Sequence, residues 1–279
     1  MQHGNKRRRK ARKCKSGPNF SGQHLLHNPK TIGDMIGIVS PRQEDLVLDI
    51  GAGKGALTFP LAGKAGRVIA VENDPAFAGA LRKKAELSAK IAVAEKDFRE
   101  MKLPNRPFCV VSNIPFSITT AVMEKLMGSD GVSFRGGALL IEYGAARRFT
   151  AERTADPRVL AWRMNFELKL IKEVPRTHFA PPPQVDGAIL RIVRKERPLL
   201  GPGQHRAFHA FASYALRDPR LPLAEALKGI FTAPQLKIAL KEAMADRGDP
   251  AMALREAQWA KLFQTMVAKV PSFRWPRGK

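Results

Sequence analysis

The sequence has few cysteines, no long apolar run and a deficit of acidic residues. Only Cys14 and Cys109 occur in 279 residues, and they form no C-x-x-C pair, so we predict neither a disulfide scaffold nor a zinc site and expect no metal. No apolar run approaches the length needed to cross a bilayer, and the polybasic N-terminus lacks the apolar core of a secretory signal. We therefore expect a protein of the reducing cytoplasm.

The charge balance points to a polyanionic partner. The chain carries 48 Lys and Arg against 25 Asp and Glu, a formal net charge of +23. Such a surplus suits nucleic acid, and the alternative of an anionic membrane lacks an amphipathic anchor. With 44% hydrophobic residues, the length allows one large domain and a small one. We expect a monomer that binds nucleic acid and no membrane.

Basic residues are concentrated at the N-terminus. The first fifteen residues include eight basic and no acidic side chains, and like-charge repulsion favours an extended segment. We predict that residues 1–18 form a disordered arm that follows phosphates, with a solubility tail as the alternative. Arg147 and Arg148 either meet phosphates or form a solvated helix face. The arm residues predicted to contact nucleic-acid phosphates are Lys6, Arg7, Arg8, Arg9, Lys10, Arg12 and Lys13.

A glycine-rich turn follows the first strong strand pattern. Residues 46–50 are an apolar run with one acidic residue, and glycines follow at 51, 53 and 55. Residues 67–72 predict a second strand that ends in Glu72, a carboxylate suited to ribose hydroxyls. A P-loop would need glycine at position 48 and Ser or Thr at 55, and a dinucleotide site would need G-x-G-x-x-G. The spacing favours a mononucleoside cofactor such as S-adenosylmethionine, with a purely structural turn as the alternative.

The remaining pattern predicts an α/β fold followed by helices. Further strands are expected at 91–93, 108–112, 137–141, 166–174 and 187–194, the last two as a closing antiparallel pair. Helices are expected from 29, over 55–64, from 75 and from 142. Pro198, Gly201, Pro202 and Gly203 indicate a linker. We therefore predict a catalytic domain over 19–197 and a helical nucleic-acid-binding domain with a basic tail over 204–279. Its helices are expected near 205–217, 221–230, 234–246 and 256–269.

Asn113-Ile114-Pro115-Phe116 is the second informative stretch. An amide and a rigid backbone at a strand end would lie in the crevice outside the sheet, with an aromatic ring beside them. The Asn113 oxygen and the Ile114 carbonyl could accept both N–H groups of an exocyclic amine while Phe116 stacks on the base. The alternative is an ordinary Asn-X-Pro turn. Asp97, just past the third strand, could face an adenine amine or act as a cap, and the proline-rich loop 176–186 is predicted to form a rigid pocket wall.

Together, these motifs resemble the rRNA adenine-N6 methyltransferases, most closely the erythromycin-resistance (Erm) methylases of large-subunit RNA. The resemblance runs from Asn19-Phe20-Ser21-Gly22-Gln23 through the glycine turn to the C-terminal helices. It implies a Rossmann-like class I S-adenosylmethionine-dependent methyltransferase domain, with a seven-stranded mixed sheet, and a small all-α C-terminal domain. It also implies N6 mono- or dimethylation of a 23S rRNA adenine and resistance to macrolide, lincosamide and streptogramin B antibiotics.

The resemblance assigns roles to individual positions. His24 and Leu26 would occupy the first cofactor-contact motif, Gly51 would lie under the methionine moiety, and Gly53 would be a further cofactor-binding residue. Many relatives have Asn in place of His24. Many also have Tyr in place of Phe116, and phenylalanine keeps the aromatic face for stacking and lacks only the hydroxyl group. The remaining roles implied are ribose binding by Glu72, adenine-amine binding by Asp97, cofactor and target contact by Asn113 with Ile114 and Pro115, and a target-adenine sandwich between Phe116 and Phe179.

Three other functions stay open at this point. A small-subunit rRNA adenine dimethyltransferase of ribosome assembly would use the same chemistry on another RNA. A noncatalytic nucleic-acid-binding factor with the same fold would bind no S-adenosylmethionine, although the intact Gly51, Glu72, Asp97 and Asn113 argue against it. A DNA adenine methylase would act on duplex DNA instead of RNA.

Overall fold

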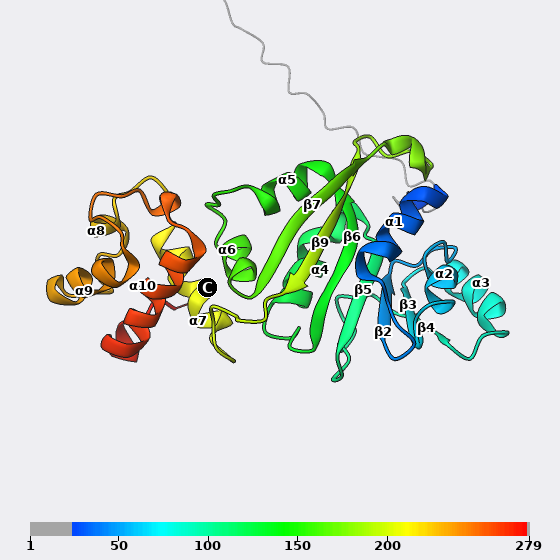
Figure 1. The fold of residues 1–279 in the computed structure, drawn as a ribbon, viewed down its shortest axis with the longest axis horizontal. Helices are drawn as coiled ribbons and strands as arrows, with labels where there is room; N and C mark the ends of the chain where they lie inside the picture. Colours follow the sequence, from blue (N-terminus) through cyan, green and yellow to red (C-terminus); the bar gives the residue numbers. More distant parts are fainter. Residues whose placement is uncertain (1–23, 278–279) are drawn as a thin grey trace, which may run out of the picture.

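A computed structural model describes residues 24–277, which form a sheet flanked by helices and a helical C-terminal part (Figure 1). The sheet has seven strands in the order β4-β3-β2-β5-β6-β9-β7, parallel except that β9 runs antiparallel to β6 and β7. The predicted mixed sheet with a closing antiparallel pair is confirmed. The strands are β2 Leu46–Ile50, β3 Arg67–Glu72, β4 Ile91–Glu95, β5 Phe108–Asn113, β6 Phe134–Glu142, β7 Phe166–Val174 and β9 Gly187–Arg194.

Helices cover both faces of this sheet, as the alternating side chains of its strands require. In β5, Val110 packs in one buried cluster and Val111 in the cluster on the opposite face, beneath α1. The buried strand interior is apolar on both sides for this reason. The helices of this part are α1 Pro29–Val39, α2 Thr58–Ala62, α3 Pro75–Ala85, α4 Thr119–Met127, α5 Tyr143–Thr150 and α6 Pro157–Asn165.

Three of these helices begin with the same chemistry. The side chains of Asn28, Asp74 and Asp156 accept backbone N–H groups of the first turn, and a proline follows each as the first helical residue. The helices expected from 29, 75 and 142 are confirmed, whereas α4 and α6 were not predicted. Helix α2 is shorter than the expected 55–64 because the chain remains in turns up to residue 57.

A two-stranded sheet joins the start of the described chain to the predicted pocket-wall loop. Strand β1 Leu25–Leu26 pairs antiparallel with β8 Phe179–Ala180. The pairing is too short to predict from periodicity, yet it fixes which side chains of the 176–186 loop point inward. Strand alternation places Phe179 in the core and Ala180 toward solvent.

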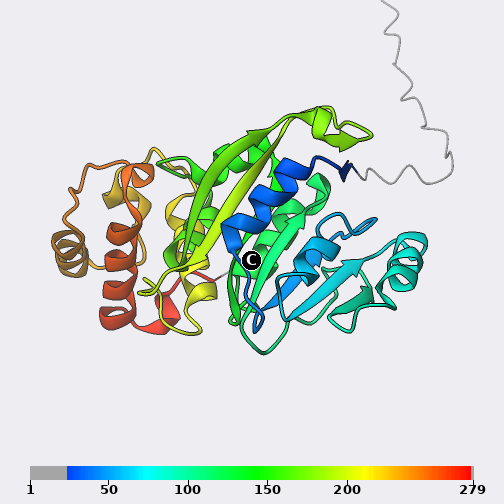
Figure 2. The ribbon, with the colours of Figure 1, turned by 45° about the vertical axis from the view of Figure 1, so that its right-hand side comes forward.

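The helical C-terminal part lies at the β7 end of the sheet, away from α3 and β4, in both views (Figures 1 and 2). Its buried cluster includes Phe208, Phe211, Trp259 and Phe263, together with residues of α6, so this core extends across the predicted boundary. The division into domains stays a prediction. The helices are α7 His205–Ala215, α8 Leu223–Ala226, α9 Ala233–Ala243 and α10 Glu256–Lys269, and α8 is shorter than the predicted 221–230.

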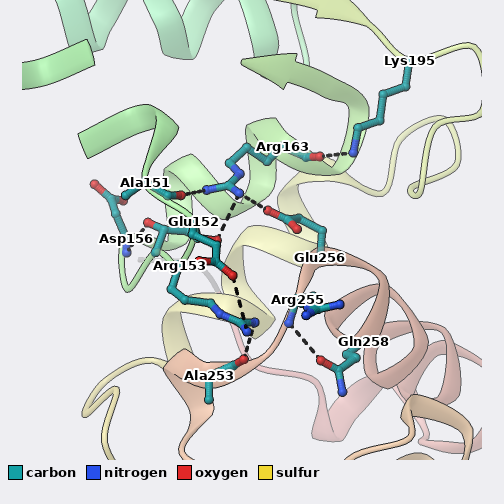
Figure 3. Close-up of polar contacts among 11 residues, drawn as sticks. Ala151, Glu152, Arg153, Asp156, Arg163, Lys195, Ala253, Arg255, Glu256 and Gln258 are labelled. Atoms are coloured by element: carbon teal, nitrogen blue, oxygen red, sulfur yellow. Dashed lines mark hydrogen bonds and ion pairs between the residues drawn. The ribbon is translucent and has the colours of Figure 1, made fainter. Parts of the chain in front are cut away.

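Polar contacts join this helical part to the loop before α6 (Figure 3). The Arg163 guanidinium donates to the Ala151 carbonyl oxygen at 2.6 Å and pairs with the Glu256 carboxylate at 2.5 Å. Arg153 donates to the Ala253 carbonyl oxygen at 2.5 Å. These contacts connect α6 and its preceding loop to the start of α10. The two parts are thus joined by directional polar bonds as well as by their shared apolar core.

Candidate active site

The glycine turn after β2 adopts a conformation that favours glycine. Gly51 and Gly53 have φ angles of +71° and +54°, in the left-handed region. A Cβ on Gly51 would lie 3.1 Å from Pro115 Cδ, and one on Gly53 would lie 2.7 Å from Leu25 Cδ2. The turn is therefore a place where the segment after β5 and the β1 segment approach the backbone closely, and both glycines are needed there.

Glu72, at the end of β3, fastens the turn to the sheet. Its buried carboxylate accepts the Gly53 backbone N–H at 2.8 Å and the Asp74 backbone N–H at 2.9 Å. Charge-assisted bonds of this kind fix both oxygens of the carboxylate. The predicted ribose contact of Glu72 stays a prediction, and the structure shows the carboxylate held in place beside the glycine turn.

Asp49 is a buried carboxyl group that the sequence analysis did not assign a role. Burial raises the pKa of Asp49 to about 7, the hydrogen bond from the Thr58 hydroxyl at 2.7 Å acts in the opposite direction, and the negative charge of Glu72 raises the pKa further. An acidic residue inside an otherwise apolar strand was the available signal. A positively charged ligand beside this group would favour its ionised form.

Two pockets share the glycine turn and Asn113. The first, which we call the glycine-turn pocket, has a volume of about 320 Å³, within the range of small-molecule sites. The second, the Phe116 pocket, is smaller. Leu25, Gly51 and Asn113 line both pockets. The glycine-turn pocket is otherwise lined by Leu26, His27, Ile32, Asp49, Ala52, Lys54, Ala56, Leu57 and Ala180, and the Phe116 pocket by His24, Asn73, Ile114, Pro115 and Phe116.

Asn113, the last residue of β5, is oriented by the segment before β1. Its amide nitrogen donates to the His24 backbone carbonyl oxygen at 2.8 Å. The carboxamide oxygen is then left as the acceptor of this side chain at the junction of the two pockets. The structure thus brings together the predicted residues Asn113, Ile114, Pro115 and Phe116 with His24 and Gly51.

His24 lies opposite Phe116. The two ring centroids are 6.5 Å apart with an interplanar angle of 43°. The His24 ring donates from Nδ1 to the Pro181 carbonyl oxygen at 2.8 Å, which connects it to the loop after β8. His24 lines the Phe116 pocket and Leu26 the glycine-turn pocket, and their assignment to the first cofactor-contact motif stays a prediction.

The structure places Phe179, the second ring of the predicted adenine sandwich, in the core. Its side chain is 1% exposed and packs in the core with Leu26, Val174 and Ile189, and it is not among the described residues that line the Phe116 pocket. The pairing of β8 with β1 turns this side chain inward, and the stacking role of Phe179 stays a prediction. The ring opposite Phe116 is that of His24.

Asp97 is not among the described residues that line either pocket. The Arg99 side chain donates to both Asp97 oxygens, and its Nη2 lies 2.5 Å from Oδ2. These hydrogen bonds lower the pKa of Asp97. The structure pairs Asp97 with Arg99, and an adenine amine would have to share this carboxylate with the guanidinium.

Arg147 and Arg148 are exposed on α5, where neither takes part in an ion pair within residues 24–277. Their guanidinium groups lie 5.9 Å from the rings of Tyr143 and Phe149. Their predicted RNA contacts stay untested, and the basic arm lies outside the described residues.

Between residues 24 and 277, no set of three or more His, Cys, Asp or Glu side chains is arranged to hold a metal ion. In the same range, no helix has the length and apolar character of a membrane span.

The sheet order, the glycine turn after β2 and the carboxylate that ends β3 define the class of protein, a Rossmann-like class I methyltransferase. The structure of the 23S rRNA methyltransferase ErmE is similar, with a TM-score of 0.74 and 27% identity over 87% of this chain and 99% of that one. A Plasmodium falciparum dimethyladenosine transferase shares the fold, with a TM-score of 0.73 and 22% identity over 88% and 98%.

Sequence comparison narrows the class to a family. The family model for ribosomal RNA adenine dimethylase matches residues 15–267. The rRNA adenine N-6-methyltransferase of Bacillus licheniformis is 42% identical over 94% of this chain and 91% of its own length. That of Bacteroides fragilis is 35% identical over 90% and 94%. The chain belongs to the ribosomal RNA adenine dimethylase family, and it is an rRNA adenine-N6-methyltransferase that uses S-adenosylmethionine.

The residues present fit this cofactor. The glycine turn has no room for further side chains at Gly51 and Gly53, and the adjoining pocket is lined by the buried Asp49, whose ionised form a cationic ligand would favour. Glu72 offers fixed carboxylate oxygens at the edge of the turn. The residues that would hold the cofactor are thus Gly51, Asp49 and Glu72, with Leu26 and Asn113 along the wall.

Proposed function

We propose that the protein methylates N6 of one adenine in 23S rRNA and thereby confers resistance to macrolide, lincosamide and streptogramin B antibiotics. The likeness to the 23S rRNA methyltransferase ErmE supports the choice of the large-subunit RNA. The observation that carries the chemistry is the position of Asn113 between the two pockets, with its amide nitrogen held by the His24 carbonyl oxygen.

In this proposal the chain positions the base and the cofactor supplies an electrophilic methyl group on a sulfonium. The Asn113 oxygen and the Ile114 carbonyl accept the two N–H groups of the exocyclic amine, so that its lone pair points toward the glycine-turn pocket. The ring of Phe116 covers one face of the adenine. Positioning of this kind can lower a barrier by ~7–11 kcal/mol in favourable systems, so Asn113 acts as an orienting group.

Cofactor contacts follow the same geometry. The Glu72 carboxylate, held at the edge of the glycine turn by the Gly53 and Asp74 backbone N–H groups, would accept hydrogen bonds from the ribose hydroxyls. Asp97 accepts the adenine amine of the cofactor once Arg99 yields part of its contact. Gly51, which lines the glycine-turn pocket, would hold the methionine portion.

RNA contacts are distributed over the whole chain. The arm over residues 1–18 and the exposed Arg147 and Arg148 neutralise phosphates, and the helical part after residue 204 adds further RNA contacts. The net charge of +23 supports binding to a polyanion. With ribosomal RNA as its substrate, the enzyme acts in the cytoplasm as a monomer.

The test is transfer of labelled methyl groups to protein-free 23S rRNA, small-subunit rRNA and duplex DNA in parallel, followed by mapping of the modified base. We expect label at a single 23S adenine, and ribosomes containing that RNA should no longer bind a labelled macrolide. Label on small-subunit rRNA would assign the enzyme to ribosome assembly, and label on DNA only would overturn the proposal.

A further inference from the structure

A groove on the helical part is separate from the two pockets of the active site. It has a volume of about 530 Å³ and lies between α7, the turn at Gly229 and the 3-10 helix η4 Ser272–Arg274 with the chain that follows. Its polar and aromatic lining comes from His209, Ser213, Tyr214, Arg274, Trp275 and Arg277. The C-terminal segment of the described chain thus forms one wall of a groove whose other walls come from α7 and the Gly229 turn.

The groove is positively charged. Its lining includes two guanidinium groups and no carboxylate, and neither Arg274 nor Arg277 forms an ion pair within residues 24–277. Arg274 makes one hydrogen bond, from Nη2 to the Gly229 carbonyl oxygen at 3.3 Å, which places its guanidinium at the groove wall. Most of the donors of both arginines therefore remain for an anionic ligand.

Its aromatic side chains are held in fixed positions. The Trp275 indole donates from Nε1 to the Val270 carbonyl oxygen at 2.8 Å and stays partly exposed. The Tyr214 hydroxyl donates to the Lys228 carbonyl oxygen at 2.5 Å, and the Arg217 guanidinium lies 4.5 Å from the Tyr214 ring. A fixed aromatic face beside free guanidinium groups is the combination that proteins use for unpaired nucleotides, because bases stack while phosphates pair with arginine.

We propose that this groove binds an unpaired nucleotide of the RNA substrate, with its base against Trp275 and its phosphate against Arg274 and Arg277. This rests on the proposed function only in that the ligand is RNA. Charge complementarity excludes the basic N-terminal arm as occupant, because the arm and the groove carry the same sign. The groove gives the helical part a defined contact with single-stranded RNA in addition to diffuse attraction.

Trp275 is an intrinsic fluorescence probe for nucleotide binding in the groove. Trp162 and Trp259 are 0% and 1% exposed, so Trp275 is the tryptophan that a ligand in the groove can reach. Titration with an octamer of uridylate, which has no adenine for the active site, should quench the tryptophan fluorescence to saturation. In Trp275→Phe the quenching should disappear, while binding measured by anisotropy of a labelled octamer persists.

A matched pair of double variants tests the phosphate contact. Arg274→Ala with Arg277→Ala and, as control, Lys237→Ala with Lys241→Ala each remove two positive charges from the helical part. The arginine variant should lower the slope of log affinity against log salt by about 1.4 for single-stranded RNA, and the control should change it less. Loss of the stack in Trp275→Ala should weaken binding roughly 5- to 150-fold.

Three outcomes would overturn the proposal. The first is absence of quenching by the octamer, the second is an equal change of slope in both double variants, and the third is equal saturation by an acidic peptide. None of these measurements involves methyl transfer. A wild-type enzyme that fails to methylate 23S rRNA but shows the quenching would therefore contradict the proposed function and leave the groove supported.

Discussion

The sheet and the helical part bury different kinds of side chain. In the described residues, the buried polar groups Asp49, Thr58, Glu72 and Ser112 surround the glycine turn, whereas Thr265 is the sole buried polar side chain of the helical part. Each group near the turn has a partner: Ser112, for example, accepts the Ile50 backbone N–H at 2.7 Å. Because buried polar groups are costly unless paired, their concentration marks the part of the fold that is shaped for chemistry.

The helical part has the opposite organisation. Its core is built from apolar and aromatic side chains such as Phe208 and Trp259, and its charged and aromatic groups line a surface groove. We infer a division of labour, in which the sheet positions reacting atoms and the helical part contributes affinity for RNA.

The largest effect is expected from Asn113→Ala. This change removes the acceptor that orients the exocyclic amine, and we expect the turnover number to fall at least about 100-fold. Labelled methyl transfer to 23S rRNA measures the loss, with unchanged circular dichroism as evidence of folding. Asn105→Ala, on an exposed loop, is the matched control. Turnover close to wild type in Asn113→Ala would remove this residue from the mechanism.

Gly53→Ala should weaken cofactor binding. A Cβ at this φ of +54° strains the backbone and pushes against the pocket-lining Leu25, and together these effects should reduce affinity about tenfold. Calorimetric titration with S-adenosylmethionine measures the change. Gly33→Ala in α1 is the control, because nothing lies within 4 Å of its added Cβ, and it should leave affinity unchanged. Equal affinities in both variants would contradict the role of the turn.

Titration of Asp49, in strand β2 of the sheet, should make the free energy of unfolding depend on pH. The pKa of Asp49 in the folded protein, about 7, is above the ordinary value of 3.8. The protonated carboxyl group therefore stabilises the fold fully below pH 3.8, and this stabilisation is lost as the pH rises to about 7. Asp49→Asn has no group that titrates here. Between pH 3.8 and about 7, its free energy of unfolding should therefore rise relative to wild type by at most about 4 kcal/mol. Chemical denaturation at several pH values measures the difference. A difference that does not vary with pH would show that Asp49 is not protonated in the folded protein.

The smallest effect is expected at the junction between the two parts. Glu256→Gln weakens the ion pair with Arg163, whose side chains are 25% and 17% exposed, and should lower stability by about 1 kcal/mol. Glu44→Gln on an exposed loop is the control and should have no effect. Denaturant unfolding followed by circular dichroism measures both. A loss in methylation rate without a loss in stability would show instead that the junction participates in catalysis.

Much of the sheet and part of the site could be predicted from the sequence. The glycine turn and the segment from Asn113 to Phe116 follow strong apolar strands, and the carboxyl ends of parallel strands meet at one edge. Helix α6 was missed although Asp156-Pro157 repeats the signal of Asp74-Pro75. Helix α4 has no side-chain cap and so gave no start signal.

The remaining differences arise from tertiary contacts between short segments. The inward turn of Phe179 depends on a two-residue strand pairing, and the approach of His24 to Phe116 depends on the bond from Asn113 to the His24 carbonyl oxygen. The pairing of Asp97 with Arg99 is set by loop geometry after β4. None of these has a periodic pattern that a single sequence displays.

The most direct test of the division of labour is a steady-state comparison on protein-free 23S rRNA. Wild type, Asn113→Ala and the Arg274→Ala with Arg277→Ala double variant are each measured for kcat and KM. We predict that Asn113→Ala loses kcat with little change in KM for RNA, whereas the double variant raises KM and keeps kcat. A double variant that loses kcat at saturating RNA, or an Asn113→Ala enzyme altered in KM alone, would contradict the account.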